Sequence, residues 1–146
     1  GELLTNYGPI NCLWFDGQAQ EAAVFYCSVF NKSKIISQNP IVTAFELNNT
    51  RFMALNGGSQ YKFTPANSYV ITCDTQDEID YYWVKLGEEG EYGMCGWLDD
   101  KFGVSWQIVP SILSELMTNP TTAPKVTQAF MRMTKFNIEE LLSAAK

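Results

Sequence analysis

The most informative feature of this 146-residue sequence is an absence: it contains no histidine. Without an imidazole, Ser-His-Asp and Cys-His nucleophilic machinery is excluded. The commonest protein ligand of catalytic zinc, iron and nickel is missing as well. Carboxylates and amides alone remain compatible with magnesium or calcium, but a transition-metal site is not expected.

Positive charge is also scarce, with 10 Lys and Arg against 16 Asp and Glu, a net charge of −6. Nucleic acid is therefore not an expected partner, because its phosphates require a basic footprint. No run approaches ~18 consecutive apolar residues, so no membrane span is expected. The start over residues 1–4 lacks a basic stretch and a long apolar core, so no signal peptide is expected.

The composition is that of a single globular domain. The chain is 46% hydrophobic and 18% charged, and a domain of this length needs neither disulfide nor metal to fold. The four cysteines stand far apart without a C-x-x-C pair, which indicates reduced, mostly buried thiols in a cytoplasmic protein. They are Cys12, Cys27, Cys73 and Cys95.

An internal repeat organises the chain. Residues 13–20 have an echo in residues 71–78, at an offset of 58 residues. Each copy begins with a short apolar strand, over 10–15 and 68–73, and each strand meets an Asp and a helix start. The repeat therefore predicts two modules of the same architecture.

The predicted helices begin with capping signals. Thr75 with Glu78 fits a capping box, and Gly17 with Gln20 is a weaker version of it. The apolar residues that follow recur with the 3.6-residue period of a helix. They are Ala22, Phe25, Tyr26, Val29 and Phe30 in the first helix and Ile79, Tyr82, Trp83 and Leu86 in the second.

Three short strands are predicted after each helix, so that the chain reads βαβββ twice. They span 34–38, 41–47 and 50–56 in module one (9–57) and 91–95, 96–99 and 104–109 in module two (66–110). Asn48-Asn49 and Asp100–Gly103 are the predicted turns, and residues 57–65 form a crossing loop. A helical C-terminal extension over 111–146 follows, with helices near 113–117, 126–133 and 138–145.

Duplicated βαβββ halves resemble the vicinal oxygen chelate superfamily, which includes glyoxalase I, bleomycin-resistance proteins, fosfomycin-resistance enzymes and extradiol dioxygenases. Within it the chain is similar to PhnB-like proteins, a group labelled "3-demethylubiquinone-9 3-methyltransferase domain". The matching stretches are CLWFDGQA at 12–19, FMALNGG at 52–58, CGWLDDKFGVSWQIVP at 95–110 and AFMRMTK at 129–135. The resemblance implies an α+β fold whose curved mixed sheets enclose a cavity, often completed by a second subunit.

The resemblance also implies where a metal would be held. Metal-dependent members place His or Glu ligands on the first and last strands of each half, at slots that here carry Ile10, Ala54, Ser68 and Gln107. A shift of one residue gives only Asn11, Leu55, Asn67 or Ile108, so no metal site and no cofactor are expected. The methyltransferase label is interpreted as a family name, because Gly57-Gly58 leads into a loop and not into a cofactor-binding helix N-terminus.

Strand alternation extends these slots to a predicted cavity lining of apolar, amide, hydroxyl and thiol groups. Leu13, Phe15, Ile71, Trp106 and Ile108 are then expected beneath the helices. The predicted lining consists of Ile10, Cys12, Trp14, Phe52, Ala54, Asn56, Ser68, Val70, Thr72, Ser105, Gln107 and Val109.

No catalytic residue stands out in this set. Glu46 and Glu91 are the nearest candidates for a general base, with solvated surface charges as the simpler interpretation. Asp99 and Asp100 are interpreted as turn residues and not as a magnesium pair. Cys12, without a nearby cation in sequence, is expected to be inert.

The sequence therefore predicts a metal-free superfamily member that binds a small organic molecule in an apolar cavity. Whether it is an enzyme stays open. One alternative is a drug-sequestering protein of the bleomycin-resistance type, with an acidic groove and Trp14, Trp97 and Trp106. Another is a His-independent lyase, isomerase or methyltransferase. A homodimer is expected, because each half leaves strand edges and a sheet face to be covered and the extension adds apolar surface.

Overall fold

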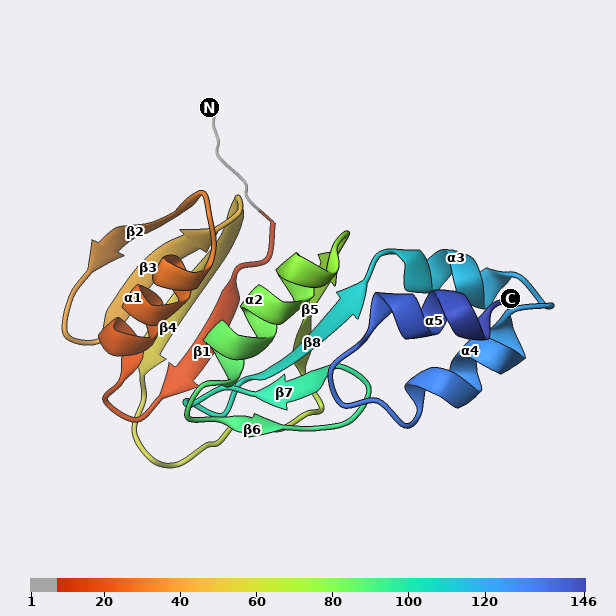
Figure 1. Ribbon diagram of the computed structural model, residues 1–146. Helices are drawn as coiled ribbons and strands as arrows, with labels where there is room; N and C mark the ends of the chain where they lie inside the picture. Colours follow the sequence, from red (N-terminus) through yellow and green to blue (C-terminus); the bar gives the residue numbers. More distant parts are fainter. Residues whose placement is uncertain (1–7) are drawn as a thin grey trace. The chain divides into compact units, whose positions relative to one another are not determined.

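A computed structural model describes residues 8–146, which form two compact units, one up to Lys62 and one from Phe63 to Lys146. The expectation about a signal peptide concerns residues 1–4 and lies outside the described residues. No helix in the described part of the chain is long and apolar enough to cross a membrane. Each unit contains a four-stranded mixed sheet with a helix on one face (Figure 1), as the βαβββ repeat predicts.

The first unit has the strand order β1-β4-β3-β2, with β1 parallel to β4 and the other pairs antiparallel. The Asn48-Asn49 turn is confirmed, since both residues have positive φ, 48° and 71°, as a type I′ hairpin requires. The elements are β1 (Asn11–Phe15), α1 (Ala19–Val29), β2 (Ser33–Gln38), β3 (Val42–Leu47) and β4 (Thr50–Asn56).

The core of the first unit lies between α1 and its sheet. Tyr26 of α1 stacks on Phe45 of β3 with 6.2 Å between ring centroids, and Phe45 stacks on Phe52 of β4 at 5.3 Å. Leu13 and Phe15 of β1 are each 3% exposed beside them. Burial of a side chain of this size stabilises the fold by about 1.5–3 kcal/mol, so these residues fix which face of the sheet meets the helix.

The start of α1 differs from the sequence-based prediction. Gln18 occupies the cap position without a side-chain hydrogen bond, so the weak box of Gly17 and Gln20 is wrong. The backbone N–H of Ala19 donates instead to Oδ1 of Asn56, at 2.8 Å. A residue from the end of β4, distant in sequence, thus takes the role that a local cap usually has.

The second unit repeats the arrangement with the order β5-β8-β7-β6. The capping box of Thr75 and Glu78 is confirmed in full at the start of the helix. The turn over 100–103 is closed by a hydrogen bond from the N–H of Gly103 to the carbonyl of Asp100, at 2.9 Å. The elements are β5 (Ser68–Cys73), α2 (Gln76–Gly87), β6 (Glu91–Tyr92), β7 (Trp97–Asp99) and β8 (Ser105–Pro110).

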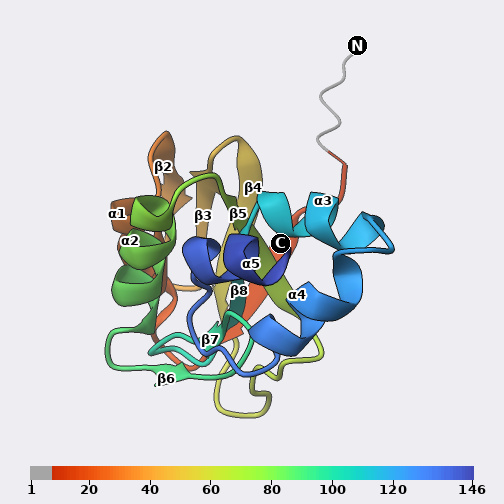
Figure 2. The ribbon, with the colours of Figure 1, turned by 45° about the vertical axis from the view of Figure 1, so that its right-hand side comes forward.

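The C-terminal extension forms three short helices that pack on one another (Figure 2), α3 (Ile112–Thr118), α4 (Ala123–Phe130) and α5 (Ile138–Ala144). The helix α5 begins at a side-chain cap, because Oδ1 of Asn137 accepts from the N–H of Glu140 at 2.9 Å. The middle helix was predicted to begin at residue 126, which is wrong by three residues. Pro124 stands in its first turn, where the missing N–H has no cost.

The extension is anchored to its own unit. The N–H groups of Cys95 and Gly96 donate to the carbonyls of Met133 and Thr134, both at 2.8 Å. The amide of Gln76 in α2 donates to the carbonyl of Phe136 at 2.9 Å and accepts from the N–H of Ile138 at 2.8 Å. The segment after α4 is therefore part of the second unit's hydrogen-bonded structure.

All four cysteines are free thiols, but the expectation that most are buried is wrong. Cys73 alone is buried, whereas Cys27 and Cys95 are half-buried and Cys12 is exposed. The reason is strand alternation: Cys73 points to the helix-covered face of its sheet, and Cys12 points to the opposite face.

Candidate functional site

Each sheet has a face covered by its helix and a face without a helix, and the strand register assigns each residue to one of them. Directly paired residues on neighbouring strands point to the same face. In the first unit Leu13 pairs with Ala54 and lies beneath α1. The alternate pairs, Cys12 with Met53 and Trp14 with Leu55, lie on the helix-free face.

The predicted lining is corrected on β4. Phe52 (5% exposed) and Ala54 (0%) lie beneath α1, and Asn56 points to the same side, where it caps that helix. The prediction placed Ala54 on the cavity face because a metal slot of the superfamily falls there. In the structure Ala54 pairs with Leu13, so it lies on the helix-covered face. Met53 and Leu55 occupy the helix-free face in their place. Ile10, just before β1, is 44% exposed.

Trp14 is the largest side chain on this face and is held in place by the segment after β4. Its indole N–H donates to the carbonyl of Gly58 at 2.8 Å, and the ring of Tyr61 meets it edge-on at 5.0 Å. A Cβ at Gly57 would lie 2.4 Å from the indole, so the chain passes the ring only as glycine. The N–H groups of Gly57 and Gly58 both donate to the carbonyl of Phe15, which leaves this glycine pair no free cradle for a phosphate.

The candidate base Glu46 is half-buried on the same face and paired. Its carboxylate lies 3.3 Å from the guanidinium of Arg51, directly opposite on β4. Glu46 is therefore better described as one half of an ion pair than as a general base.

The helix-free face of the second unit carries hydroxyl and amide groups among apolar and acidic side chains. Nε2 of Gln107 donates to Oγ of Ser68 at 3.0 Å, and Oγ of Ser105 donates to Oδ1 of Asp99 at 2.7 Å. Six of the predicted residues lie on this face by their pairing: Ser68 with Ser105, Val70 with Gln107 and Thr72 with Val109. Their role as a cavity lining stays a prediction.

Five residues were predicted beneath the helices. Leu13, Phe15, Trp106 and Ile108 are buried there, each at most 3% exposed, and Ile71 shares their face but is only half-buried. The indole ring of Trp106 is held on the helix-covered side of the sheet, because its N–H donates to Oδ2 of Asp100 at 2.9 Å. It therefore cannot line a ligand groove.

Asp100 is confirmed as a turn residue. It is 3% exposed, and its Oδ1 accepts from the N–H groups of Phe102 at 2.8 Å and Val104 at 3.1 Å. The interpretation of Asp99 as a turn residue is wrong, because it is the last residue of β7 and pairs with Ser105. It points to the opposite face of the strand, so the two carboxylates do not converge. Nowhere in residues 8–146 do three His, Cys, Asp or Glu side chains gather as a possible metal site.

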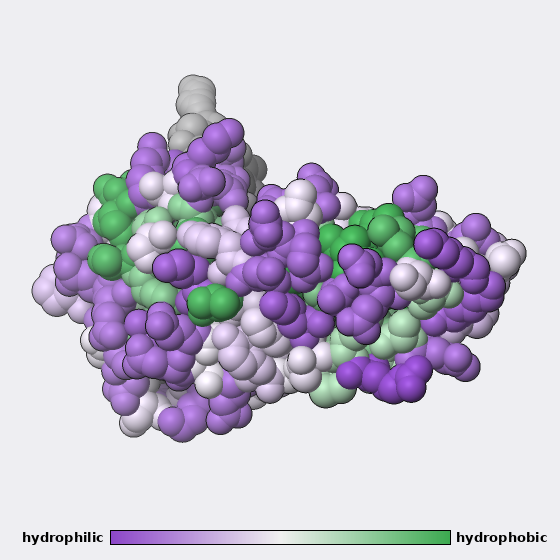
Figure 3. All heavy atoms as spheres, viewed as in Figure 1, coloured by the Kyte–Doolittle hydropathy of each residue, from purple (hydrophilic) through white to green (hydrophobic). Residues whose placement is uncertain are grey.

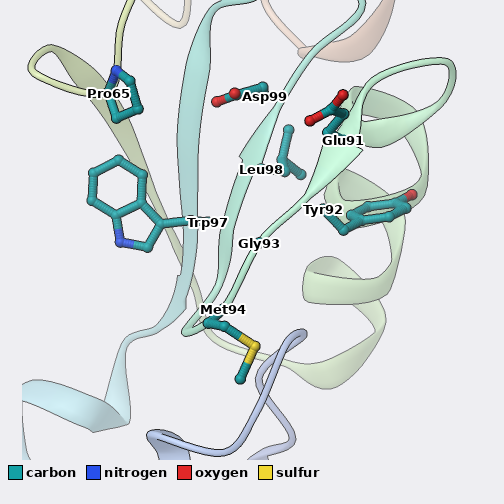
Figure 4. Close-up of a pocket in the computed structure, with 8 residues that line it drawn as sticks. All are labelled: Pro65, Glu91, Tyr92, Gly93, Met94, Trp97, Leu98 and Asp99. Carbon is teal, nitrogen blue, oxygen red and sulfur yellow. The ribbon is translucent and has the colours of Figure 1, made fainter.

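A pocket of about 380 Å³ lies along β6 and β7 (Figure 4). Trp97 and Asp99 belong to its helix-free side, since they pair with Gln107 and Ser105. Tyr92 points to the other side, where it stacks on Trp83 at 4.6 Å and donates its hydroxyl to the carbonyl of that residue. The lining consists of Pro65, Glu91, Tyr92, Gly93, Met94, Trp97, Leu98 and Asp99.

The sequence-based lining missed Trp97, Asp99 and Glu91. The sequence signal that could have found them is the hairpin turn over 100–103. A hairpin with this turn pairs Trp97 with Gln107, and paired residues share a face. The antiparallel pairing of Glu91 with Asp99 then adds the edge strand. The missed residues are the ones that make this end of the face acidic and aromatic.

Cys73 has no place in such a site. It lies on the helix-covered face, and burial, reinforced by the negative charges of Glu78 and Asp74, raises the pKa of its thiol to about 11. A thiol with so high a pKa is protonated at neutral pH and is not a nucleophile. Burial also raises the pKa of Cys27.

Two four-stranded mixed sheets, each a βαβββ module with one free face, define the vicinal oxygen chelate fold. The FosX protein from Listeria monocytogenes, whose structure holds Mn(II) and sulfate, is similar in fold: TM-score 0.59, 14% identity, covering 79% of this chain and 98% of that one. A glyoxalase-related enzyme from Fulvimarina pelagi has a TM-score of 0.51 at 10% identity, covering 72% and 89%. The class is thus set by the fold.

Within that class, the 3-demethylubiquinone-9 3-methyltransferase family model matches residues 8–109, and the chain belongs to this family. The PhnB protein from Bacillus cereus is 35% identical with a TM-score of 0.65, over 70% of this chain and 98% of that chain. No curated protein matches the sequence. The family match ends before α3, so the helical extension lies outside it.

Proposed function

We propose that this protein binds a small organic molecule on the helix-free faces of its sheets and that it does so without a metal ion. The observation that carries the proposal is the hydrogen bond between Gln107 and Ser68. These residues occupy the positions where metal-dependent members of the superfamily would need charged or imidazole ligands. Two neutral side chains that bind one another are poor ligands for a divalent cation.

The first unit supports the same conclusion. Its helix-free face presents the thiol of Cys12, Met53, Leu55 and the indole of Trp14, none of which is a hard oxygen ligand. Apolar side chains with a few fixed polar groups are typical of sites for small organic molecules. Among the described residues of this face, the carboxylate nearest to hand for a metal is that of Glu46, which is bound to Arg51.

We do not carry the family name over as an activity. A methyl-transfer site needs a place for its cofactor, and the glycine pair that resembles one is bonded to Phe15 and leads into a loop. Glu46 is paired, Asp100 is structural and Cys73 is protonated, so no residue of the faces described above acts as an evident base or nucleophile. The proposal is therefore one of binding, with no reaction assigned.

The direct test is metal analysis of protein purified without chelators and offered zinc, nickel, manganese and iron. We expect far less than one equivalent of each metal. A matched pair of variants, Ser68→Ala and Gln107→Ala, should leave the metal content unchanged. Tight stoichiometric binding of one metal, lost in these variants, would overturn the metal-free proposal.

Ligand binding is tested separately by native mass spectrometry of freshly purified protein. We expect an adduct of small mass that is released on denaturation, and a thermal-shift screen should find compounds that raise the melting temperature. S-adenosylmethionine, glutathione and quinone-like compounds belong in that screen, because a shift with one of them would favour a His-independent enzyme over a binding protein.

Assembly as a homodimer and residence in the cytoplasm are further parts of the proposal. The free thiols are consistent with a reducing compartment. The helical extension has the exposed apolar side chains Met117, Met131 and Leu142, and Figure 3 shows hydrophobic surface over the region of α3–α5. Both observations are consistent with a second subunit that covers this surface.

A further inference from the structure

The net negative charge of the chain falls on one unit. Residues 1–62 carry four Lys and Arg and four Asp and Glu, which balance. Residues 63–146 carry six Lys and Arg against twelve Asp and Glu, so the entire net charge of −6 falls on the second unit. A general need for solubility would not require such asymmetry, and a field of one sign attracts ligands of the other.

Two of these carboxylates, Glu91 and Asp99, belong to the lining of the pocket on β6 and β7. Glu91 and Asp99 are directly paired on adjacent antiparallel strands, where like charges destabilise the pair. Asp99 accepts from Ser105, and no Lys or Arg belongs to the pocket lining. A cation bound at this position would relieve the repulsion.

The rest of the lining is apolar and suits an organic group. Trp97 and Pro65 stand on the same side of the strands as the Asp99 carboxylate, and Met94 lies at the end of the pocket (Figure 4). An indole face binds a planar ring by stacking and a cation through its quadrupole. A bare metal ion would find only two carboxylates here, since the described residues offer no third acidic, Cys or His ligand.

We infer that this pocket takes a small planar organic cation, with its ring on the indole of Trp97 and its positive charge at Glu91 and Asp99. The inference rests on the proposed function and names the ligand class for it. A volume of about 380 Å³ is that of a small ligand site. Neither Trp106, which is buried and bound to Asp100, nor Trp14 is among the residues that line this pocket.

The test uses three probes that share a naphthalene ring and carry different charges: 2-naphthylmethylamine, which is cationic at pH 7, neutral 2-naphthalenemethanol and anionic 2-naphthoate. Calorimetric titration of the full chain at low ionic strength should give at least about ten-fold tighter binding for the amine than for the alcohol. The naphthoate should bind least. Added salt should weaken the binding of the amine and leave the affinity for the alcohol unchanged.

Three variants locate the effect. Glu91→Gln and Asp99→Asn should each reduce the preference for the amine. Trp97→Ala should weaken the binding of the amine and of the alcohol to a similar extent. Glu115→Gln on α3 removes the same charge outside the pocket and should leave both affinities unchanged. Because Glu91→Gln also removes a like-charge pair, the free variant should melt no lower than the parent, so lost binding would not reflect unfolding.

Equal affinity for the three probes would overturn the ligand class and leave the proposed function intact. An amine preference that survives both carboxylate variants, or that Glu115→Gln removes equally, would overturn the assignment to this pocket. One-to-one binding of Mg²⁺ or Ca²⁺ that blocks the amine would replace the organic cation with an inorganic one. The proposed function fails by a different result, the tight transition-metal content described above.

Discussion

At the scale of single residues, the carboxylate of Asp100 holds together the turn that positions the pocket strands. It accepts two backbone N–H groups and the indole N–H of Trp106 while almost fully buried. Asp100→Ala leaves three donors without this acceptor, and we expect a loss of about 3 kcal/mol in the free energy of unfolding. Urea denaturation measures it, with Asp99→Ala, which removes one bond from Ser105, as the milder control. Equal losses would show that Asp100 has no special role.

Cys73 predicts a pH dependence of stability. Its folded pKa of about 11 lies above the ordinary thiol value of 9.0, so between these values the unfolded chain releases a proton that the folded chain keeps. Stability therefore falls as pH rises from about 9 to 11. Urea midpoints across this range should fall less in Cys73→Ala than in the parent.

Iodoacetamide at pH 8 should modify the exposed Cys12 well before Cys73, and the reverse order would contradict the burial of Cys73.

At the scale of elements, the start of α1 depends on a strand and not on its own sequence. Asn56 accepts from Ala19 and donates to the carbonyl of Pro40 at 3.1 Å. Asn56→Ala should cost about 1 kcal/mol, the usual value of a lost helix cap. Thr75→Ala, which removes a local cap from α2, is the matched comparison, and Gln20→Ala should have little effect. A loss with Gln20→Ala as large as with Asn56→Ala would restore the local box.

The elements themselves could be predicted from the sequence because their signals are local. The period of Ile79 and Leu86, the box of Thr75 and Glu78 and the Asn48-Asn49 turn each specify structure within a few residues. The faces of the strands are another matter. The face of β4 depends on which residue of β1 lies beside it, a contact across about forty residues, and the predicted parity was reversed for that reason.

The candidate site shows the same division. Ser68 and Gln107 were predicted to share a face and they form a hydrogen bond. From the sequence alone, Glu91 is a candidate base and not a lining residue, and Trp97 does not belong to the predicted lining. Both belong to the pocket through pairing with Asp99 and Gln107, which needs the position of the hairpin turn and not the identity of the residues.

At the scale of the whole molecule, the proposed homodimer gives a direct measurement. Light scattering after size exclusion at micromolar concentration should report ~33 kDa, twice the chain mass of 16.5 kDa. Charged replacements of the exposed Met131 and Leu142 should shift the protein toward monomer if the extension forms the interface. A monomeric parent protein would contradict the homodimer.

Truncation after Pro110 tests the role of the extension within its own unit. The cut removes Val126, Phe136 and Leu141, each at most 2% exposed, and leaves a groove beside Gly96, whose Cβ position is filled by Phe136. We expect a melting temperature well below that of the full chain, or loss of the fold. Gln76→Ala is the milder variant, because it removes two of the hydrogen bonds that anchor the extension and leaves the chain at full length. Full stability in both variants would show that the extension is dispensable.

The bond between Gln76 and Phe136 spans 60 residues and bears on how the protein is made. At a synthesis rate of about 5–20 residues per second, α2 leaves the ribosome several seconds before the segment that completes its packing. The first unit has no such dependence, since its pairings end at Asn56 and its aromatic anchor at Tyr61. During synthesis the first module should therefore complete its packing while the second still lacks the segment that contains Phe136. In this interval the second module exposes apolar surface that a chaperone could bind.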